Sequence, residues 1–267
     1  MKYAFVTTNL LDLWAEPRFN SERLNQLFFG QPVQVGGRRK GYCRVVSLRD
    51  DYGGWADERF LCPITKTAAL AYQRGCTSVI TKSSARLSDP RGNTCIAPHL
   101  VYYGTPVHIK SRRGTLVRAE LPDGSLIGLK SSTVKSIHSI KQKSDVSGRR
   151  VIAEARRLLG TPYLWGGVSS PGCDCSGLVQ TVFGVLGIAL PRDTKDQIAC
   201  GRPIAREETR AGDLLFFKRH VGIALGSHRI IHSSVGGGGV RENSLSADGA
   251  DYRADLDHAF AEARRIL

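Results

Sequence analysis

The sequence predicts an α+β protein in which a helix packs on an antiparallel sheet, preceded by two small β-barrels. Three observations carry this prediction: a buried helix that starts at Cys175, a series of short apolar strands after it, and an internal repeat in the first half. With 267 residues, the chain is long enough for more than one domain. We expect a first barrel at 1–65, a second at 66–140, and the helix-and-sheet domain at 141–267.

The first half contains a degenerate repeat whose two copies lie 74 positions apart. Gly30 corresponds to Gly104 at this offset, and Gly54 corresponds to Gly128. Each copy has short alternating strands separated by Gly, Asp and Pro turns, which is typical of a small β-barrel. The repeat therefore predicts two barrels of similar architecture.

A polar segment at 141–147 is predicted to link the repeats to the last domain. Apolar residues then recur at helical spacing from Val151 to Leu159. This spacing predicts a short amphipathic helix that ends at Gly160.

The stretch Asp174-Cys175-Ser176-Gly177 opens an apolar segment with helical spacing. A cysteine on the first turn of a helix faces free N–H groups and the positive end of the helix dipole, and both lower the pKa of a thiol. Cys175 is therefore a candidate nucleophile, although free cysteines are also commonly buried as packing residues.

Two histidines follow on predicted strands. His220 opens an apolar run that comes after another at 213–217, and the short basic link between them indicates adjacent antiparallel strands. The next strand carries His232. A cysteine nucleophile needs a base and a group that orients the base, and this chain order brings all three to the start of the helix. His228 shares the strand parity of His232, so spacing alone does not choose between them.

Six ordered motifs between about residues 148 and 245 closely resemble the NlpC-type cell-wall cysteine peptidases. They are Gly160-Thr161-Pro162-Tyr163-Leu164-Trp165-Gly166-Gly167, Asp174-Cys175-Ser176-Gly177, Pro191-Arg192-Asp193-Thr194, Ala211-Gly212-Asp213-Leu214, His220-Val221-Gly222-Ile223 and Ile231-His232. The resemblance implies a papain-like fold and cleavage of the peptide stems of peptidoglycan. The two repeats resemble the bacterial SH3-like modules that are often fused ahead of such domains.

The same resemblance implies roles for four residues. Cys175 is the nucleophile, His220 is the general base, and His232 orients the base. Tyr163 matches a tyrosine beside the nucleophile, where it can help to bind the oxyanion.

The motif details resemble the γ-D-glutamyl-L-diamino acid endopeptidases of muropeptide recycling, which need a free N-terminal L-alanine on the stem. A buried ammonium must be paired, and Asp174 is placed to pair it. An N-cap of the catalytic helix is the equal alternative for Asp174, and a loop cap is one for Asp193. The other implied substrate-binding residues are Ser176, Asp193, Thr194 and Trp165, with Tyr52 and Glu22 from the first barrel.

The resulting functional prediction is a cysteine peptidase that hydrolyses the γ-D-glutamyl–diamino acid bond of stem peptides with a free L-Ala. One alternative is a D,L-endopeptidase or amidase that acts on intact wall, with the barrels as anchors. Another is a non-catalytic binding module with a vestigial enzyme half. The retained Cys175, His220 and His232 argue against the last alternative.

Composition bounds the possible ligands. The chain has 38 Lys and Arg and 24 Asp and Glu, a net charge of +14. Because the basic residues are spread over all three regions without an aromatic-interleaved stripe, we expect no nucleic-acid partner; solubility or attraction to an anionic wall polymer accounts for the charge. Cys173 and Cys175 are too close in sequence for a paired structural zinc site, so no metal or cofactor is expected.

Location is predicted from three features of the sequence. There is no apolar stretch of about 18 residues, and the N-terminus has no apolar signal region with a cleavage site. The seven cysteines are scattered and odd in number, which favours reduced thiols. These features favour a cytoplasmic protein; a mature chain would instead be periplasmic or secreted. The expected partners are muropeptides, and a monomer is favoured, although the sequence does not determine the oligomeric state.

Overall fold

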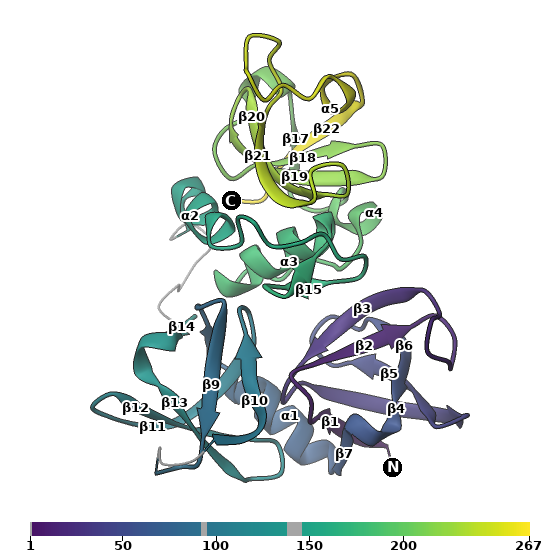
Figure 1. Ribbon diagram of the computed structural model, residues 1–267, viewed down its shortest axis with the longest axis vertical. Coiled ribbons are helices and arrows are strands. Elements are labelled where there is room, and N and C mark those ends of the chain that lie inside the picture. The colour runs from purple at the N-terminus through teal and green to yellow at the C-terminus, as the bar shows by residue number, and fades with distance from the viewer. Residues whose placement is uncertain (1, 92–94, 138–145) are drawn as a thin grey trace. The chain divides into compact units, whose positions relative to one another are not determined.

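The computed structural model describes residues 2–91, 95–137 and 146–267, and the side chains of 95–97 are not described. The chain divides into two compact units, 1–139 and 140–267 (Figure 1). The first unit contains two seven-stranded antiparallel sheets, and the second contains a six-stranded antiparallel sheet with its helices.

The first sheet has the strand order β3-β2-β6-β5-β4-β1-β7. Its strands are β1 (Tyr3–Val6), β2 (Leu10–Trp14), β3 (Arg23–Phe28), β4 (Pro32–Arg39), β5 (Tyr42–Ser47), β6 (Gly53–Asp57) and β7 (Leu61–Ile64), with a 3-10 turn η1 (Glu58–Phe60). Alternate residues of these strands face one closed core that includes Leu13, Leu27 and Val45. The alternation in sequence is therefore the alternation of core and solvent faces.

The second sheet repeats this topology. Its strand order, β10-β9-β13-β12-β11-β8-β14, is the first order shifted by seven strands. The strands are β8 (Ser78–Ile80), β9 (Ser84–Ser88), β10 (Cys95–Tyr102), β11 (Pro106–Arg113), β12 (Leu116–Glu120), β13 (Leu126–Lys130) and β14 (Val134–Ser136), with η2 (Ser131–Thr133) before the last. The prediction of two barrels of similar architecture is confirmed.

The corresponding glycines of the repeat occupy the same kind of turn. Gly30 has φ +77° and Gly104 has φ +88°, which is a region that favours glycine. The Gly30 N–H donates to the Val6 carbonyl, and the Gly104 N–H donates to the Ile80 carbonyl, 74 positions further on. The repeated glycine is thus a backbone requirement of the turn between the third and fourth strands of each barrel.

A helix between the barrels was missed by the sequence prediction. Helix α1 (Lys66–Gly75) begins at Thr65, whose hydroxyl accepts a hydrogen bond from the Ala68 N–H. Its Tyr72 is buried against the backbone of Gly30, where an added Cβ would lie 2.6 Å from the phenol oxygen. The signal was present in the Thr65 N-cap and in the helix-forming residues that follow it.

The second unit has the sheet order β17-β22-β18-β19-β20-β21. Its strands are β17 (Arg202–Ile204), β18 (Leu214–Phe217), β19 (His220–Gly226), β20 (Arg229–Ser234), β21 (Gly239–Ser244) and β22 (Phe260–Arg265), with a small ribbon of β15 (Val168–Ser169) and β16 (Gly172–Cys173). The helices are α2 (Gly148–Arg156), α3 (Cys175–Val185), α4 (Thr194–Gln197), the 3-10 turn η4 (Arg206–Glu208) and α5 (Ala254–His258). The predicted neighbouring strands β18, β19 and β20 are antiparallel neighbours.

Helix α3 packs on the sheet of the second unit, where it contacts β19 and β20, and it also contacts α2 (Figure 1). Its ten buried residues include Leu178, Val182 and Phe183, which are fully buried. Gly177 allows the close approach of α3 to the loop before it, since an added Cβ would lie 2.1 Å from the Gly167 carbonyl oxygen. Helix α2 ends at Arg156, four residues earlier than predicted, and a turn continues to Gly160.

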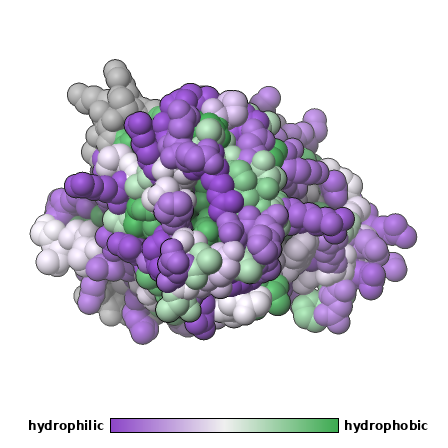
Figure 2. Space-filling model, turned by 90° about the horizontal axis from the view of Figure 1, so that it is seen from above, coloured by the Kyte–Doolittle hydropathy of each residue, from purple (hydrophilic) through white to green (hydrophobic). Residues whose placement is uncertain are grey.

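Exposed apolar side chains are few and separated along the chain. Those that are large and exposed among the described residues are Phe19, Phe60, Leu126, Leu159, Trp165 and Val235. The face drawn in Figure 2 is mostly hydrophilic, with small hydrophobic patches between polar groups. Within the described part of the chain, no helix has the length and apolar character needed to cross a membrane.

Candidate active site

Cys175 is the first residue of helix α3, where the sequence placed it. Asp174 is the N-cap, and its Oδ1 accepts a 2.7 Å hydrogen bond from the Gly177 N–H. Cys175 as a whole residue is 9% exposed, so it is largely shielded from water.

The pKa of Cys175 is opposite in direction to the prediction. Burial raises the pKa of the thiol, and the negative charge of Asp174 raises it further. The N–H of Val221, the hydroxyl of Thr194 and the N–H of Ser176 lower the pKa, but they contribute less than burial does. The predicted lowering is therefore wrong, because the helix-end donors do not offset the desolvation of the thiolate. The sulfur carries its proton at neutral pH and needs a base to lose it.

The two histidines form one hydrogen-bonded pair. His220 Nε2 and His232 Nδ1 are 2.8 Å apart, with the two rings nearly perpendicular. His232 is fully buried on β20, whereas His228 is exposed. Tertiary structure thus chooses between the two candidates that spacing left open.

Burial keeps both imidazoles neutral. It lowers the pKa of His220 to about 3, with a further contribution from the neighbouring His232. Burial also lowers the pKa of His232, against a smaller opposing effect of its hydrogen bond to Asn243. A neutral imidazole has one lone pair, so His220 can accept a proton at neutral pH.

The strand that begins at His220 lies beside the sulfur. Val221, the next residue, directs its backbone N–H to the Cys175 sulfur. The Thr194 hydroxyl, at the start of α4, is 3.9 Å from the same sulfur. The thiol is therefore bordered by β19 on one side and by α4 on another.

Tyr163 lies close enough to Cys175 for their charges to interact. Its segment bridges to Cys173, two residues before the nucleophile. Burial raises the pKa of Tyr163 to about 12, and a charge on Cys175 raises it too. The phenol is therefore protonated at neutral pH and is a hydrogen-bond donor.

A second polar cluster surrounds Asp174, and its central partner, Arg192, was not predicted as a site residue. Arg192 is nearly fully buried and binds Asp174 through two nitrogens, at 2.6 and 3.0 Å. It also donates to the Ser176 hydroxyl at 2.8 Å. The sequence signal for Arg192 was its place within Pro191-Arg192-Asp193-Thr194, one of the six ordered motifs.

The Asp174 carboxylate accepts five hydrogen bonds inside the protein. Two come from Arg192, and the others come from the Gly166 N–H, the Gly177 N–H and the Ser176 hydroxyl. The N-cap alternative is thus what the structure shows. Binding of a substrate ammonium by Asp174 or Ser176 stays a prediction, and it requires some of these bonds to be shared.

The remaining predicted residues lie in three places. Trp165 is 58% exposed, so its indole ring is accessible for apolar contact with a substrate. Asp193 precedes α4 at its N-cap position but makes no side-chain cap hydrogen bond there. In the first barrel, Tyr52 packs against the core and Glu22 is exposed. Their roles in substrate binding stay predictions.

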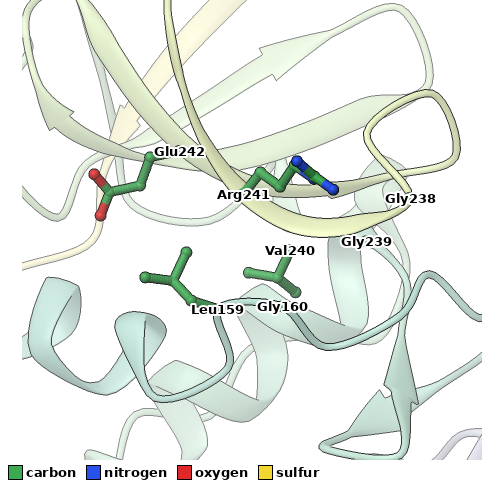
Figure 3. Close-up of a pocket in the computed structure, with 7 residues that line it drawn as sticks. All are labelled: Leu159, Gly160, Gly238, Gly239, Val240, Arg241 and Glu242. Carbon is green, nitrogen blue, oxygen red and sulfur yellow. The ribbon is translucent and has the colours of Figure 1, made fainter. Parts of the chain in front are cut away.

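A surface hollow of about 470 Å³ lies between the turn after α2 and strand β21 (Figure 3). It is lined by Leu159, Gly160, Gly238, Gly239, Val240, Arg241 and Glu242. In Figure 3, Arg241 and Glu242 extend from the same strand in different directions above Leu159. No group of three potential metal ligands occurs among residues 2–91, 95–137 and 146–267.

Comparison with known sequences gives the class of this fold and site. Residues 160–256 match the NlpC/P60 family, and residues 13–60 match the bacterial dipeptidyl-peptidase Sh3 domain. A probable endopeptidase NlpC homolog of Haemophilus influenzae is 36% identical over 162 residues, which cover 57% of this chain and 85% of that protein. The chain belongs to the NlpC/P60 family and is a cysteine peptidase.

Two relatives match over nearly the whole chain. Dipeptidyl-peptidase 6 of Lysinibacillus sphaericus is 28% identical over 264 residues, 95% of each chain. Gamma-D-glutamyl-L-lysine dipeptidyl-peptidase of Bacillus cereus is 25% identical over 292 aligned positions, 97% of this chain and 83% of that protein. The crystal structure of an NlpC/P60 family protein from Bacillus cereus has the same fold, with a TM-score of 0.82 at 23% identity over 99% of both chains.

Proposed function

We propose that this enzyme hydrolyses the γ-D-glutamyl–diamino acid bond of soluble peptidoglycan stem peptides that carry a free N-terminal L-alanine. The observation that carries the chemical part is the neutral His220–His232 pair on strands beside the helix that begins at Cys175. The match to dipeptidyl-peptidases along almost the whole chain supports the substrate part. We extend the proposal to a cytoplasmic enzyme that acts on recycled fragments.

In the first half-reaction, the Cys175 thiol turns towards His220, which takes the proton as the sulfur attacks the scissile carbonyl. The raised pKa of the thiol and the lowered pKa of the imidazole disfavour a thiolate–imidazolium pair in the free enzyme. The proton therefore moves to His220 only as the sulfur–carbon bond forms. The carbonyl oxygen becomes an oxyanion, held by the Cys175 N–H at the helix end and by the Tyr163 hydroxyl.

His220 then gives its proton to the amine of the diamino acid, and the C–N bond breaks. The acyl group remains on sulfur as a thioester. In the second half-reaction, His220 takes a proton from water, and the hydroxide attacks the thioester. The proton returns to the sulfur as the dipeptide leaves, which restores both groups.

The test uses the defined peptide L-Ala-γ-D-Glu-diamino acid with the full-length enzyme, and mass spectrometry identifies the products. We expect L-Ala-γ-D-Glu and the free diamino acid. Acetylation of the alanine amine is expected to lower kcat/KM by about 100-fold or more, because a site built for a polar group rejects an analogue that lacks it. Equal cleavage of the acetylated peptide would remove the free-amine requirement and leave the peptidase chemistry intact.

The alternative is action on intact wall, with the barrels as anchors. The same enzyme is incubated with purified sacculi and with soluble stem peptides at equal concentrations of the scissile bond. We expect release from the soluble peptides alone. Faster release from sacculi would favour the wall-directed enzyme.

A further inference from the structure

Asn243 extends the histidine pair by one residue and was not singled out in the sequence. It lies on edge strand β21, where it is paired in register with Ile230 of β20. Its Oδ1 is 3.0 Å from His232 Nε2, and its Nδ2 donates to the backbone carbonyl of Asp251 at 3.1 Å. A continuous hydrogen-bonded chain therefore runs from His220 to a main-chain carbonyl.

The fixed end of this chain determines every donor in it. The Asp251 carbonyl can only accept, so the NH₂ end of the Asn243 amide must face it. The amide oxygen then faces His232 and can only accept, so the hydrogen of the neutral His232 ring is on Nε2. The His232 Nδ1 is consequently bare.

The tautomer of His220 follows from that of His232. Because the bare Nδ1 of His232 accepts the 2.8 Å hydrogen bond, the hydrogen of the neutral His220 ring is on Nε2. The lone pair of His220 is then on Nδ1, the nitrogen not used in the pair. The orientation of one amide thus selects which nitrogen of His220 is the base.

We propose that Asn243 is a positioning residue, which sets the tautomers of His232 and His220 so that Nδ1 of His220 receives the proton of Cys175. Asn243 acts through His232, the ring to which its Oδ1 is hydrogen-bonded. This inference rests on the proposed roles of Cys175 and His220 and requires nothing of the peptide that is cut.

Loss of the Asn243 amide allows His232 to adopt the Nδ1–H tautomer. With Asn243→Leu, His232 can carry its hydrogen on Nδ1 and donate it to Nε2 of His220, which moves the His220 hydrogen to Nδ1. A base in the wrong tautomer costs up to about 10⁴-fold in kcat in a serine-protease triad. We expect a loss in kcat of about 100-fold or more for Asn243→Leu, with little change in KM.

The acid variant separates positioning from packing. Asn243→Asp keeps an acceptor for the Nε2–H of His232 but loses the donor to the Asp251 carbonyl. The tautomers persist, so kcat is expected to fall below wild type but to exceed that of Asn243→Leu by at least about tenfold. Its negative charge favours the protonated imidazoles, so the acidic limb of the pH profile moves to higher pH. The other charged groups that act on both rings, Arg253 and Asp255, are unchanged.

The matched control is Glu242→Gln on the same strand. Glu242 accepts a 2.6 Å hydrogen bond from Arg156, outside the histidine chain. The substitution removes the negative charge from this contact of β21 but leaves Asn243 in place, so we expect kcat within about twofold of wild type. A large loss in this control would assign the effect to the strand and overturn the positioning role.

A measurement without substrate decides the inference independently of the proposed function. Nitrogen-15 NMR of the imidazoles in the full-length wild-type protein distinguishes Nε2–H from Nδ1–H. We expect both His220 and His232 as Nε2–H, and a mixture at His232 in Asn243→Leu. Detection of Nδ1–H at His232 in the wild type would overturn the proposal, whether or not the variant folds.

Discussion

The second unit contains two polar clusters, one that carries buried charges and one that is neutral. One is the charged cluster of Asp174, Arg192 and Ser176, in which the carboxylate accepts five hydrogen bonds from its surroundings. The other is the neutral chain of His220, His232 and Asn243, with one hydrogen bond between successive members.

The difference in charge between the two clusters indicates which of them stabilises the structure and which can take part in proton transfer. A buried charge pair with many hydrogen bonds holds the backbone around it in place, because loss of either partner would leave the other charge uncompensated. A neutral chain that ends in an unused lone pair can gain and return a proton. The charged cluster therefore fixes the start of α3, and the neutral chain is suited to act on the sulfur at that start.

The largest expected effect separates chemistry from architecture at Cys175. Cys175→Ala removes the nucleophile and is expected to lower kcat by about 10⁴-fold or more, as loss of a nucleophile does in other hydrolases. The N-cap and the buried face of α3 remain, so circular dichroism and the melting temperature should change little. Cys200→Ala removes a partly exposed thiol elsewhere and serves as the control. Turnover near wild type in Cys175→Ala would show that another group is the nucleophile.

The second effect tests the structural role of the charged cluster. Arg192→Met leaves Asp174 buried without its cation, and we expect the free energy of unfolding to fall by about 3–5 kcal/mol in urea titrations. The control is Arg18→Met, which removes an exposed pair with Glu16 and should change stability much less, because solvent screens a surface ion pair. Equal losses in the two variants would mean that the buried pair does not anchor the helix start.

The smallest effect tests the neutrality of the histidine pair. Because burial lowers the pKa of His220 to about 3, the unfolded chain binds more protons than the folded one below about pH 6.5. The free energy of unfolding should therefore decline as the pH falls from 6.5 to 5. His220→Gln should flatten this slope, whereas replacement of the exposed His228 by Gln should keep it. A slope that His220→Gln leaves unchanged would indicate a protonated imidazole in the folded protein.

Local sequence patterns predicted much of the fold and part of the site. The helical spacing after Cys175 placed the thiol at a helix start, and the paired apolar runs gave β18 and β19 as antiparallel strands. The offset of 74 residues predicted two similar barrels. Helix α1 was missed because it interrupts an otherwise alternating pattern between the barrels.

The sequence by itself determined which chemical groups are present and in what order along the chain, because helix and strand periodicities are local. Only the tertiary structure decided that His232 rather than His228 pairs with His220, that Arg192 saturates Asp174, and that burial raises the thiol pKa. Those outcomes depend on desolvation and on partners from distant segments, and neither quantity is encoded in the spacing of neighbouring residues.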